Sequence, residues 1–277
     1  MSRGWRELRR GRLALPGAAV VCAFAVAALL APWLAPADPT RSDLANVLAR
    51  PGAAHLLGTD ELGRDMLSRI IHGARLSMLE GLFAVGLALA LGLPLGLAAG
   101  YAGGTVDAVL MRVVDVLLAF PGVLLAVAVV SILGPGLWNA MVAVAIYSVP
   151  VFARLARGST LSVKQEVYIE GCRALGMSNL RIVGRHVLPN IAAPLLVMAA
   201  LRVAVAILTA SSLSFLGLGA QPPTPEWGAM LSNGRNYVLI APHLVIFPGL
   251  AILLLVLGLN LFQEGLREAL DPRLTDR

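Results

Sequence analysis

The chain has 277 residues, of which 58% are hydrophobic and only 14% are charged. Soluble domains are about 45–50% apolar and about 25% charged, so this composition and a mean hydropathy of +0.80 exclude an ordinary soluble globular protein. The net charge is +6, from 22 basic and 16 acidic residues. Lys164 is the only lysine and follows Val163, so the sequence has no Gly-Lys-Ser/Thr loop for ATP phosphates. HExxH and GxSxG are absent too, and Cys22 and Cys172 are too far apart for a CxxC site.

Apolar stretches long enough to cross a membrane recur along the whole chain. A helix needs about 20 residues to cross a hydrocarbon core about 30 Å thick. One stretch, 116–152, is too long for a single helix, and Gly134-Pro135-Gly136 divides it into two. The other spans are predicted within residues 13–37, 81–106, 189–215 and 244–262. The sequence therefore predicts an all-α, polytopic membrane protein with six transmembrane helices.

Basic residues are distributed unequally between the two sides that these spans define. Both termini fall on one side, which receives 15 basic residues, whereas the opposite side receives 6. The richer side is expected to be cytoplasmic, so the basic charge indicates topology rather than a nucleic-acid surface. The N-terminus also resembles a signal peptide ending at Ala35-Pro36-Ala37, but its apolar run exceeds the about 7–15 residues of a signal h-region. We expect an uncleaved first helix that buries Cys22, and cleavage is the alternative.

The polar segment 38–77 follows the first span and has a helical pattern of its own. Thr59 or Asp60 is a candidate N-cap, and Asp65 and Arg69 have the spacing of an i,i+4 ion pair. The apolar residues at helical spacing are Leu62, Met66, Leu67, Ile70 and Ile71. We predict an interfacial helix that lies on the membrane, with a docking surface for an outside partner as the alternative.

Four glycines, Gly92, Gly96, Gly100 and Gly104, recur every four residues along the second span. Small residues at this spacing lie along one side of a helix and let a neighbouring backbone approach closely. We therefore predict tight helix packing on this side of the span. Pro94 within the same span suggests a kink.

Charged residues near the third span and within the fifth need partners, because an isolated charge in lipid is unfavourable. Arg112 and Asp115 are spaced to pair, and with Asp107 they are interpreted as a cluster at the cytoplasmic interface. A role in the permeation path is the alternative. Arg202 lies near the middle of the fifth span without a local acid. It is expected to line a pathway or subunit interface, with a distant acid such as Glu80 as a candidate partner, or else to snorkel to the surface.

The connection 158–188 between the fourth and fifth spans is long and has the pattern of two short helices. Ser162 and Gln165 have the spacing of a capping box. A helix is predicted over residues 166–175, and Gly176 is a natural C′ residue because glycine adopts positive φ without strain.

A second short helix is predicted over residues 179–187, with Ser178 as its cap and Pro189 at the start of the next span. The small residues of the first helix are Gly171, Cys172 and Ala174. They give that helix a low surface, which suits docking into a groove on another protein. We expect the Cys172 thiol to be accessible, with partial shielding by its own loop as the alternative.

The same connection carries a family resemblance. Glu170-Gly171-Cys172, Gly176 and Leu188-Pro189 match the spacing of the EAA loop of ABC importer permeases. The run EVYIEGCRALGMSNLRIVGRHVLPN resembles the dipeptide/oligopeptide/nickel branch of that family in particular. Further similar runs are HLLGTDELGRDMLSRIIHGARLS (55–77), GYAGGTVDAVLMRVVDVLLAFPG (100–122), LSFLGLGAQPPTPEWGAML (213–231) and GLREALDPRL (265–274). Two departures are Gly171-Cys172 in place of the family's two alanines, and Ala210-Ser211 where the family often has an acid.

The resemblance implies a type-I ABC importer permease fold and a chain that forms the membrane pathway with a homologous permease, as a heterodimer. Two ABC ATPase subunits are expected at the cytoplasmic face, with the helix of the coupling loop 158–188 in a groove of one of them. An extracytoplasmic solute-binding protein is expected to deliver the cargo. ATP binding then closes the ATPase pair, and the loop transmits this movement to produce alternating access. The matching coupling positions are Glu170, Gly171, Cys172, Arg173, Ala174, Gly176 and Pro189. The chain itself is expected to hold no catalytic residue, metal, cofactor or nucleic acid, because the ATPase subunits bind ATP and Mg²⁺.

On the same resemblance, residues 1–72 hold the N-terminal tail, the first helix and the outer polar segment. Residues 73–264 hold the permease domain, and residues 265–277 form a cytoplasmic tail. The expected location is a bacterial or archaeal cytoplasmic membrane. The resemblance is compatible with four kinds of cargo: dipeptides, longer peptides, glutathione and nickel chelates.

Two other classes of membrane protein are less compatible with the sequence. A self-sufficient channel or secondary transporter tends to carry acids at its span centres for ion coupling, and the predicted centres have none. A membrane-embedded enzyme needs a nucleophile–base pair or a metal cluster at depth. The four histidines, at positions 55, 72, 186 and 243, have no metal-ligand spacing.

Overall fold

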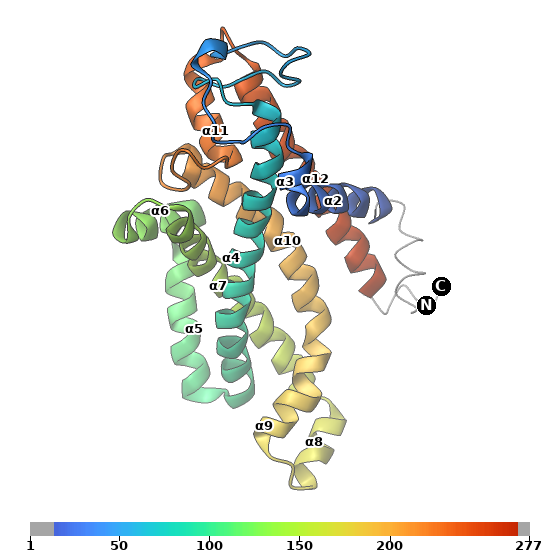
Figure 1. Cartoon of the computed structure of the whole chain (residues 1–277). Helices are drawn as coiled ribbons and strands as arrows, with labels where there is room; N and C mark the ends of the chain where they lie inside the picture. Colours follow the sequence, from blue (N-terminus) through green and yellow to red (C-terminus); the bar gives the residue numbers. More distant parts are fainter. Residues whose placement is uncertain (1–13, 271–277) are drawn as a thin grey trace.

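The computed structural model describes residues 14–270, and this part of the chain is helical, as predicted, without a β-strand (Figure 1). The Arg-rich N-terminal tail and the last residues of the C-terminal tail lie outside the described residues. The elements are α2 (Ala14–Leu29), α3 (Ala31–Leu34), η1 (Leu44–Asn46), α4 (Met66–Ala102), α5 (Gly104–Ala119), α6 (Gly122–Leu133), α7 (Leu137–Lys164), α8 (Val167–Ala174), α9 (Asn179–Ile182), η2 (Val183–Val187), α10 (Leu188–Phe215), α11 (Trp227–Gly234), η3 (Arg235–Tyr237) and α12 (His243–Leu270).

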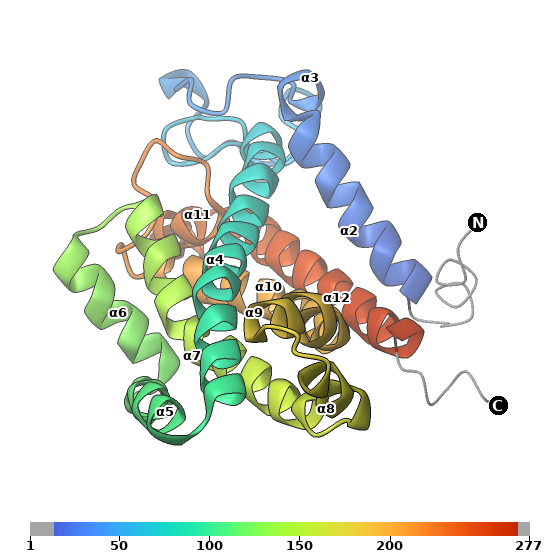
Figure 2. The same cartoon turned by 90° about the horizontal axis from the view of Figure 1, so that it is seen from below.

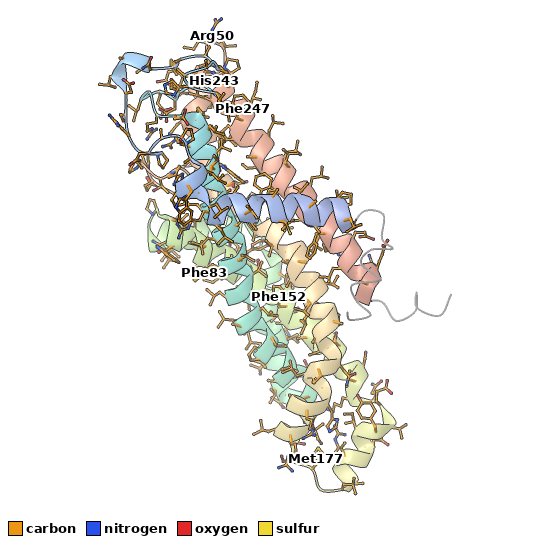
Figure 3. All side chains as sticks on the ribbon, turned by 45° about the vertical axis from the view of Figure 1, so that its right-hand side comes forward. Arg50, Phe83, Phe152, Met177, His243 and Phe247 are labelled. Carbon is orange, nitrogen blue, oxygen red and sulfur yellow. The ribbon has the colours of Figure 1, made fainter. Side chains whose placement is uncertain are left out.

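Three long helices, α4, α7 and α10, pack against one another and form the centre of the bundle. Phe152 of α7 is fully buried near the middle of this bundle (Figure 3). Helix α12 packs on α10, and α2 runs beside α12 (Figure 2). Helices α8 and α9 protrude at one end of the molecule, and α11 lies with the polar segment 38–65 at the opposite end (Figure 1). These ends are named the α8 end and the α11 end.

The six predicted membrane spans are confirmed in part. Within residues 14–270, four helices are long and apolar enough to cross a membrane, or five if α5 and α6 together form one broken span. Helices α5 and α6 are bent by 95° at Phe120 and Pro121, a break that the sequence analysis did not predict. The predicted break at residues 134–136 is confirmed, since α6 ends at Leu133 and α7 begins at Leu137. The described part of the first predicted span is a 16-residue helix, α2, followed by the short α3.

The glycine stripe of α4 packs against α7, as predicted. An added Cβ at Gly96 would collide with the carbonyl oxygen of Ala153, and Gly92 and Gly100 meet the α7 backbone in the same way. Close backbone approach is therefore the reason for glycine at these three positions. Gly104 differs, because it opens α5 with φ of +54° and has no neighbour within 4 Å of an added Cβ.

Helices α2 and α12 cross where Gly17 meets the backbone of Leu261 and Phe262, and Gly258 meets Val20. The start of α2 thus lies beside the last turns of α12. Cys22 is exposed on the surface of this chain, so the described residues do not cover its thiol. Its burial by lipid in the first span stays a prediction.

No separate interfacial helix follows the polar segment. Helix α4 begins at Met66 and continues for 37 residues, about 55 Å at 1.5 Å per residue, so it extends beyond the hydrocarbon core. Asp65 is its N-cap and accepts a hydrogen bond from the Ser68 N–H at 2.8 Å, which replaces the predicted cap at Thr59 or Asp60. The predicted Asp65–Arg69 pair is also wrong. The Asp65 carboxylate instead accepts a hydrogen bond from the Ser68 hydroxyl and lies 3.0 Å from His55 Nδ1.

The polar segment 38–65 is a folded cap anchored by buried charges. Asp60 accepts hydrogen bonds from the Arg64 side chain at 2.6 Å and lies 3.3 Å from Arg69 Nε, and Arg64 also pairs with Glu61 at 2.9 Å. The Thr59 carbonyl lies 3.0 Å from His243 Nε2 at the start of α12, and Figure 3 shows His243 at this end of the molecule. The segment thereby joins the α11 ends of α4 and α12.

Candidate functional site

The loop that resembles the EAA motif forms a protruding unit, named the α8–α9 segment (residues 166–187). Its first helix, α8, spans Val167–Ala174, close to the predicted 166–175. Gly176 has φ of +76°, so the predicted C′ role is confirmed. The predicted capping box at Ser162 and Gln165 is wrong, because helix α7 continues to Lys164 and includes Ser162. The Ser162 hydroxyl donates to the Gly158 carbonyl of the same helix at 3.4 Å.

The second predicted helix of the segment is not separate from the next span. Helix α9 passes through the π-helical turn η2 directly into α10, which makes one helix over Asn179–Phe215. Pro189 therefore lies inside a continuous helix and does not start a new one. It is tolerated there because it is within the first two residues after the π-turn, where the backbone hydrogen bonding changes pattern.

The coupling positions implied by the resemblance lie mostly on the surface of the segment. Glu170, Gly171, Arg173, Ala174, Gly176 and Pro189 are exposed, whereas Cys172 is half-buried against the core. Ile169 and Ile182 are fully buried and fix the segment to the bundle. The thiol of Cys172 is therefore partly shielded, in agreement with the alternative expected from the sequence.

Three large apolar side chains of the same segment are exposed and were missed by the sequence analysis. Val167 is 82% exposed, Leu175 is 87% exposed and Leu180 is 88% exposed. Their signal was present in the sequence as apolar residues within a polar connection, but only the fold shows which of these residues face outward. Exposed apolar groups that project from one end of a protein are typical of a surface that another protein covers.

A second contact fixes the segment to α10. The Asn190 side-chain amide donates to the Tyr168 hydroxyl at 3.2 Å and to the His186 carbonyl at 2.6 Å. The Tyr168 and His186 rings lie 6.2 Å apart between centroids. Helix α8 is thereby connected to the beginning of α10, one of the long apolar helices of the bundle.

The charged cluster of α5 pairs with α7 and not within itself. Arg157 Nη2 donates to Asp107 at 2.6 Å, and Arg154 Nη2 donates to Asp115 at 2.6 Å. Arg112, the predicted partner of Asp115, is exposed and makes neither of these pairs. Spacing within α5 could not show these partners, because they come from a helix about 40–50 residues further along the chain.

Arg202 is held by an aromatic side chain. Its Nη1 donates to the Tyr147 hydroxyl at 3.1 Å, and its guanidinium carbon lies 5.9 Å from the centroid of the same ring. The predicted acidic partner, Glu80, does not appear among its contacts in the described residues. A cation–π contact with a hydrogen bond is a satisfactory environment for a half-buried guanidinium.

Glu80 is the least satisfied polar side chain of the bundle. It is fully buried in α4, and neither carboxylate oxygen has a hydrogen-bond partner among the described residues. Glu226, the N-cap of α11, is a second fully buried carboxylate of the same bundle. Glu226 itself is well satisfied, with hydrogen bonds from the Gly228 and Ala229 N–H groups at 2.8 Å each and from Ser211 at 3.2 Å.

Removal of the Glu226 carboxylate should lower the free energy of unfolding, whereas removal of the Glu80 carboxylate should not. We expect Glu226→Ala to lower the free energy of unfolding by about 1–3 kcal/mol, because it leaves buried N–H groups unpaired. Glu80→Met should leave it unchanged or raise it, because an unpartnered buried carboxyl is replaced by an apolar side chain of similar length. Thermal unfolding in detergent measures both variants, and a loss in Glu80→Met as large as in Glu226→Ala would contradict this interpretation.

Comparison with known proteins identifies the family. Residues 92–276 match the binding-protein-dependent transport system inner membrane component, and residues 1–51 match the N-terminal TM domain of oligopeptide transport permease C. The glutathione transport system permease protein GsiD of Shigella flexneri serotype 5b (strain 8401) is 52% identical over 271 residues, 98% of this chain and 89% of that protein. GsiD of Escherichia coli O6:K15:H31 (strain 536 / UPEC) is 49% identical over the same coverage.

A solved structure shares the fold. An inward-facing form of the MetNI methionine ABC transporter matches with a TM-score of 0.60 at 19% identity, over 74% of this chain and 98% of that one. The bundle of apolar helices described above thus has the fold of an ABC importer permease. The chain belongs to the binding-protein-dependent transport system inner membrane component family. It is a multi-pass membrane permease subunit and not an enzyme, and ATP hydrolysis resides in separate subunits.

Proposed function

We propose that this permease imports glutathione or another short peptide delivered by a solute-binding protein. The observation that carries this proposal is the 52% identity to a glutathione permease across 98% of the chain. The match of the N-terminal region to an oligopeptide permease supports the wider class of peptide cargo. Glutathione is itself a tripeptide, so the two similarities point to one chemical class.

The cargo can be tested by uptake in cells that express the complete transporter. We expect radiolabelled glutathione or a short peptide to accumulate only when this chain is present, and unlabelled cargo of the same class to compete. A nickel chelate should neither accumulate nor compete. Uptake of the chelate, with no effect of glutathione or peptides, would assign a different cargo and contradict the proposal.

We further propose that the chain pairs with a homologous permease and that two ATPase subunits, which bind ATP and Mg²⁺, bind the cytoplasmic face. One of these two subunits covers the α8–α9 segment of this chain. Three observations support this placement. The segment projects from the bundle (Figure 1), it exposes Val167, Leu175 and Leu180, and it carries the residues that match the EAA spacing. The excess of basic residues on the side of the chain that holds this segment and both termini supports a cytoplasmic location.

In this arrangement the exposed small residues of α8 let the ATPase surface approach closely, and the exposed leucines supply apolar contact area. Closure of the ATPase pair moves the α8–α9 segment. The segment is continuous with α10 through η2, and Tyr168 contacts Asn190 in the first turn of α10. Movement of the segment therefore reaches the membrane-spanning part of the chain through α10 directly.

A further inference from the structure

Tyr101 lies where four helices meet at the α8 end. It occupies the last turn of α4, and its ring is flanked by two cations. Lys164 Nζ lies 5.6 Å from the ring centroid, and the Arg173 guanidinium carbon lies 5.6 Å from it. Lys164 ends α7 and Arg173 belongs to α8, so one aromatic ring contacts charged groups from two other helices at cation–π distance.

Hydrogen bonds add the fourth helix and fix the ring. The Tyr101 hydroxyl donates to Asn179 Oδ1, at the start of α9, at 2.9 Å. The Lys164 ammonium donates to the Tyr101 carbonyl at 2.6 Å. That carbonyl is among the last of α4 and has no partner within its own helix. The only lysine of the chain thus caps α4 and also lies against the ring.

We propose that Tyr101 is a positioning residue that clamps the α8–α9 segment to the ends of α4 and α7. This inference rests on the proposed role of the segment as the ATPase contact. Through α10 alone, displacement of the segment would reach one long helix. Through Tyr101 it also reaches α4, and α4 packs on α7 along the glycine stripe, so the core of the bundle moves with the segment.

Ion pairs extend the same connection to α5. Arg157, two turns before Lys164 on α7, binds Asp107 on α5. The clamp, the glycine stripe and this pair link α8, α9, α4, α7 and α5 by contacts between packed side chains and backbone. A contiguous set of this kind can transmit displacement, and variants along such sets change coupling by about 2- to 30-fold.

The test is the number of cargo molecules imported per ATP hydrolysed by the complete transporter in proteoliposomes. Tyr101→Leu removes the ring and the hydroxyl, and should lower this ratio about tenfold. Tyr101→Phe keeps the ring and removes only the hydroxyl, so it should retain most of the ratio. The transport ratio of Asn179→Ala should equal that of Tyr101→Phe. The double variant, Tyr101→Phe with Asn179→Ala, should have a ratio no lower than either single variant, because both substitutions remove the same hydrogen bond.

The control is Tyr237→Phe at the α11 end, which should leave the ratio unchanged. A purely structural role of Tyr101 would lower transport and ATP hydrolysis in proportion, so an unchanged ratio in Tyr101→Leu would overturn the clamp. Failure of the wild-type complex to import any peptide would instead overturn the proposed function.

A second measurement tests the clamp without transport. A nitroxide label on Leu175→Cys, in a chain with Cys22→Ser and Cys172→Ser, reports the mobility of the α8–α9 segment. We expect Tyr101→Leu to increase the mobility of the label and Tyr237→Phe to leave it unchanged. Equal mobility in Tyr101→Leu and the unsubstituted background would overturn the clamp even if transport is never observed.

Discussion

Gly96→Ala should be among the most destabilising single-methyl substitutions in this protein. The added Cβ would collide with the carbonyl oxygen of Ala153 on α7, and neither backbone can move without disturbing a long helix. Overpacking of this kind costs about 1–3 kcal/mol, and Gly96→Val should prevent accumulation of the folded chain. Thermal unfolding in detergent and the amount of protein in the membrane measure these effects.

Gly86 provides a matched control within the same helix. It is exposed, and an added Cβ would have no neighbour within 4 Å. Because alanine favours the helix over glycine by about 1 kcal/mol, Gly86→Ala should leave stability unchanged or increase it. If Gly86→Ala and Gly96→Ala destabilise equally, the packing of α4 on α7 described above is incorrect.

Ala174→Glu should reduce ATP-driven transport more than tenfold while the chain still folds. Ala174 is exposed on α8, so the substitution leaves the core of the chain intact. In the assembled transporter it would bury an unpaired charge in a contact between two proteins, which costs about 3–5 kcal/mol. Co-purification of the ATPase subunits with the permease, followed by uptake, measures the effect.

Ala53→Glu is the control for that substitution, since Ala53 is equally exposed but lies in the polar segment at the opposite end. It should leave ATPase binding and transport unchanged. Normal transport by Ala174→Glu would show that the exposed face of α8 does not contact the ATPase.

Features set by local chain chemistry could be predicted from the sequence. Gly176 was recognised as a helix C′ residue, and the break at Gly134-Pro135-Gly136 was located correctly, because glycine and proline restrict or free the backbone wherever they occur. The stripe of Gly92, Gly96 and Gly100 was also recognised, since a spacing of four places residues on one helix face.

Features that depend on contacts between distant segments could not be predicted in this way. Asp115 has an acceptable partner by spacing in Arg112, but in the folded chain the guanidinium groups of α7 pair with both Asp115 and Asp107. Likewise, Arg202 binds Tyr147 rather than an acid. Helix packing determines which residue lies beside a charged side chain in a bundle. The spacing of residues within one helix does not show which residues of another helix those are.

Helix boundaries show a third kind of difference. The sequence predicts a separation between the second loop helix and the fifth span at Pro189, because proline is common at the first position of a helix. The structure instead carries α9 through the π-turn η2 into α10. This continuity has a functional consequence, since one continuous helix connects the proposed ATPase contact to the membrane-spanning part of the chain.

The central claim is that one of the two ATPase subunits covers the α8–α9 segment on the cytoplasmic side. Leu175 is the position to probe, because its side chain is almost fully exposed and Cys172 is half-buried. A membrane-impermeant maleimide is applied to the Leu175→Cys chain, with Cys22→Ser and Cys172→Ser, in vesicles of known orientation. We predict labelling in inside-out vesicles of the permease pair, none in right-side-out vesicles, and strong protection when the ATPase subunits are bound. Labelling from the outside, or equal labelling with and without the ATPase subunits, would contradict the account.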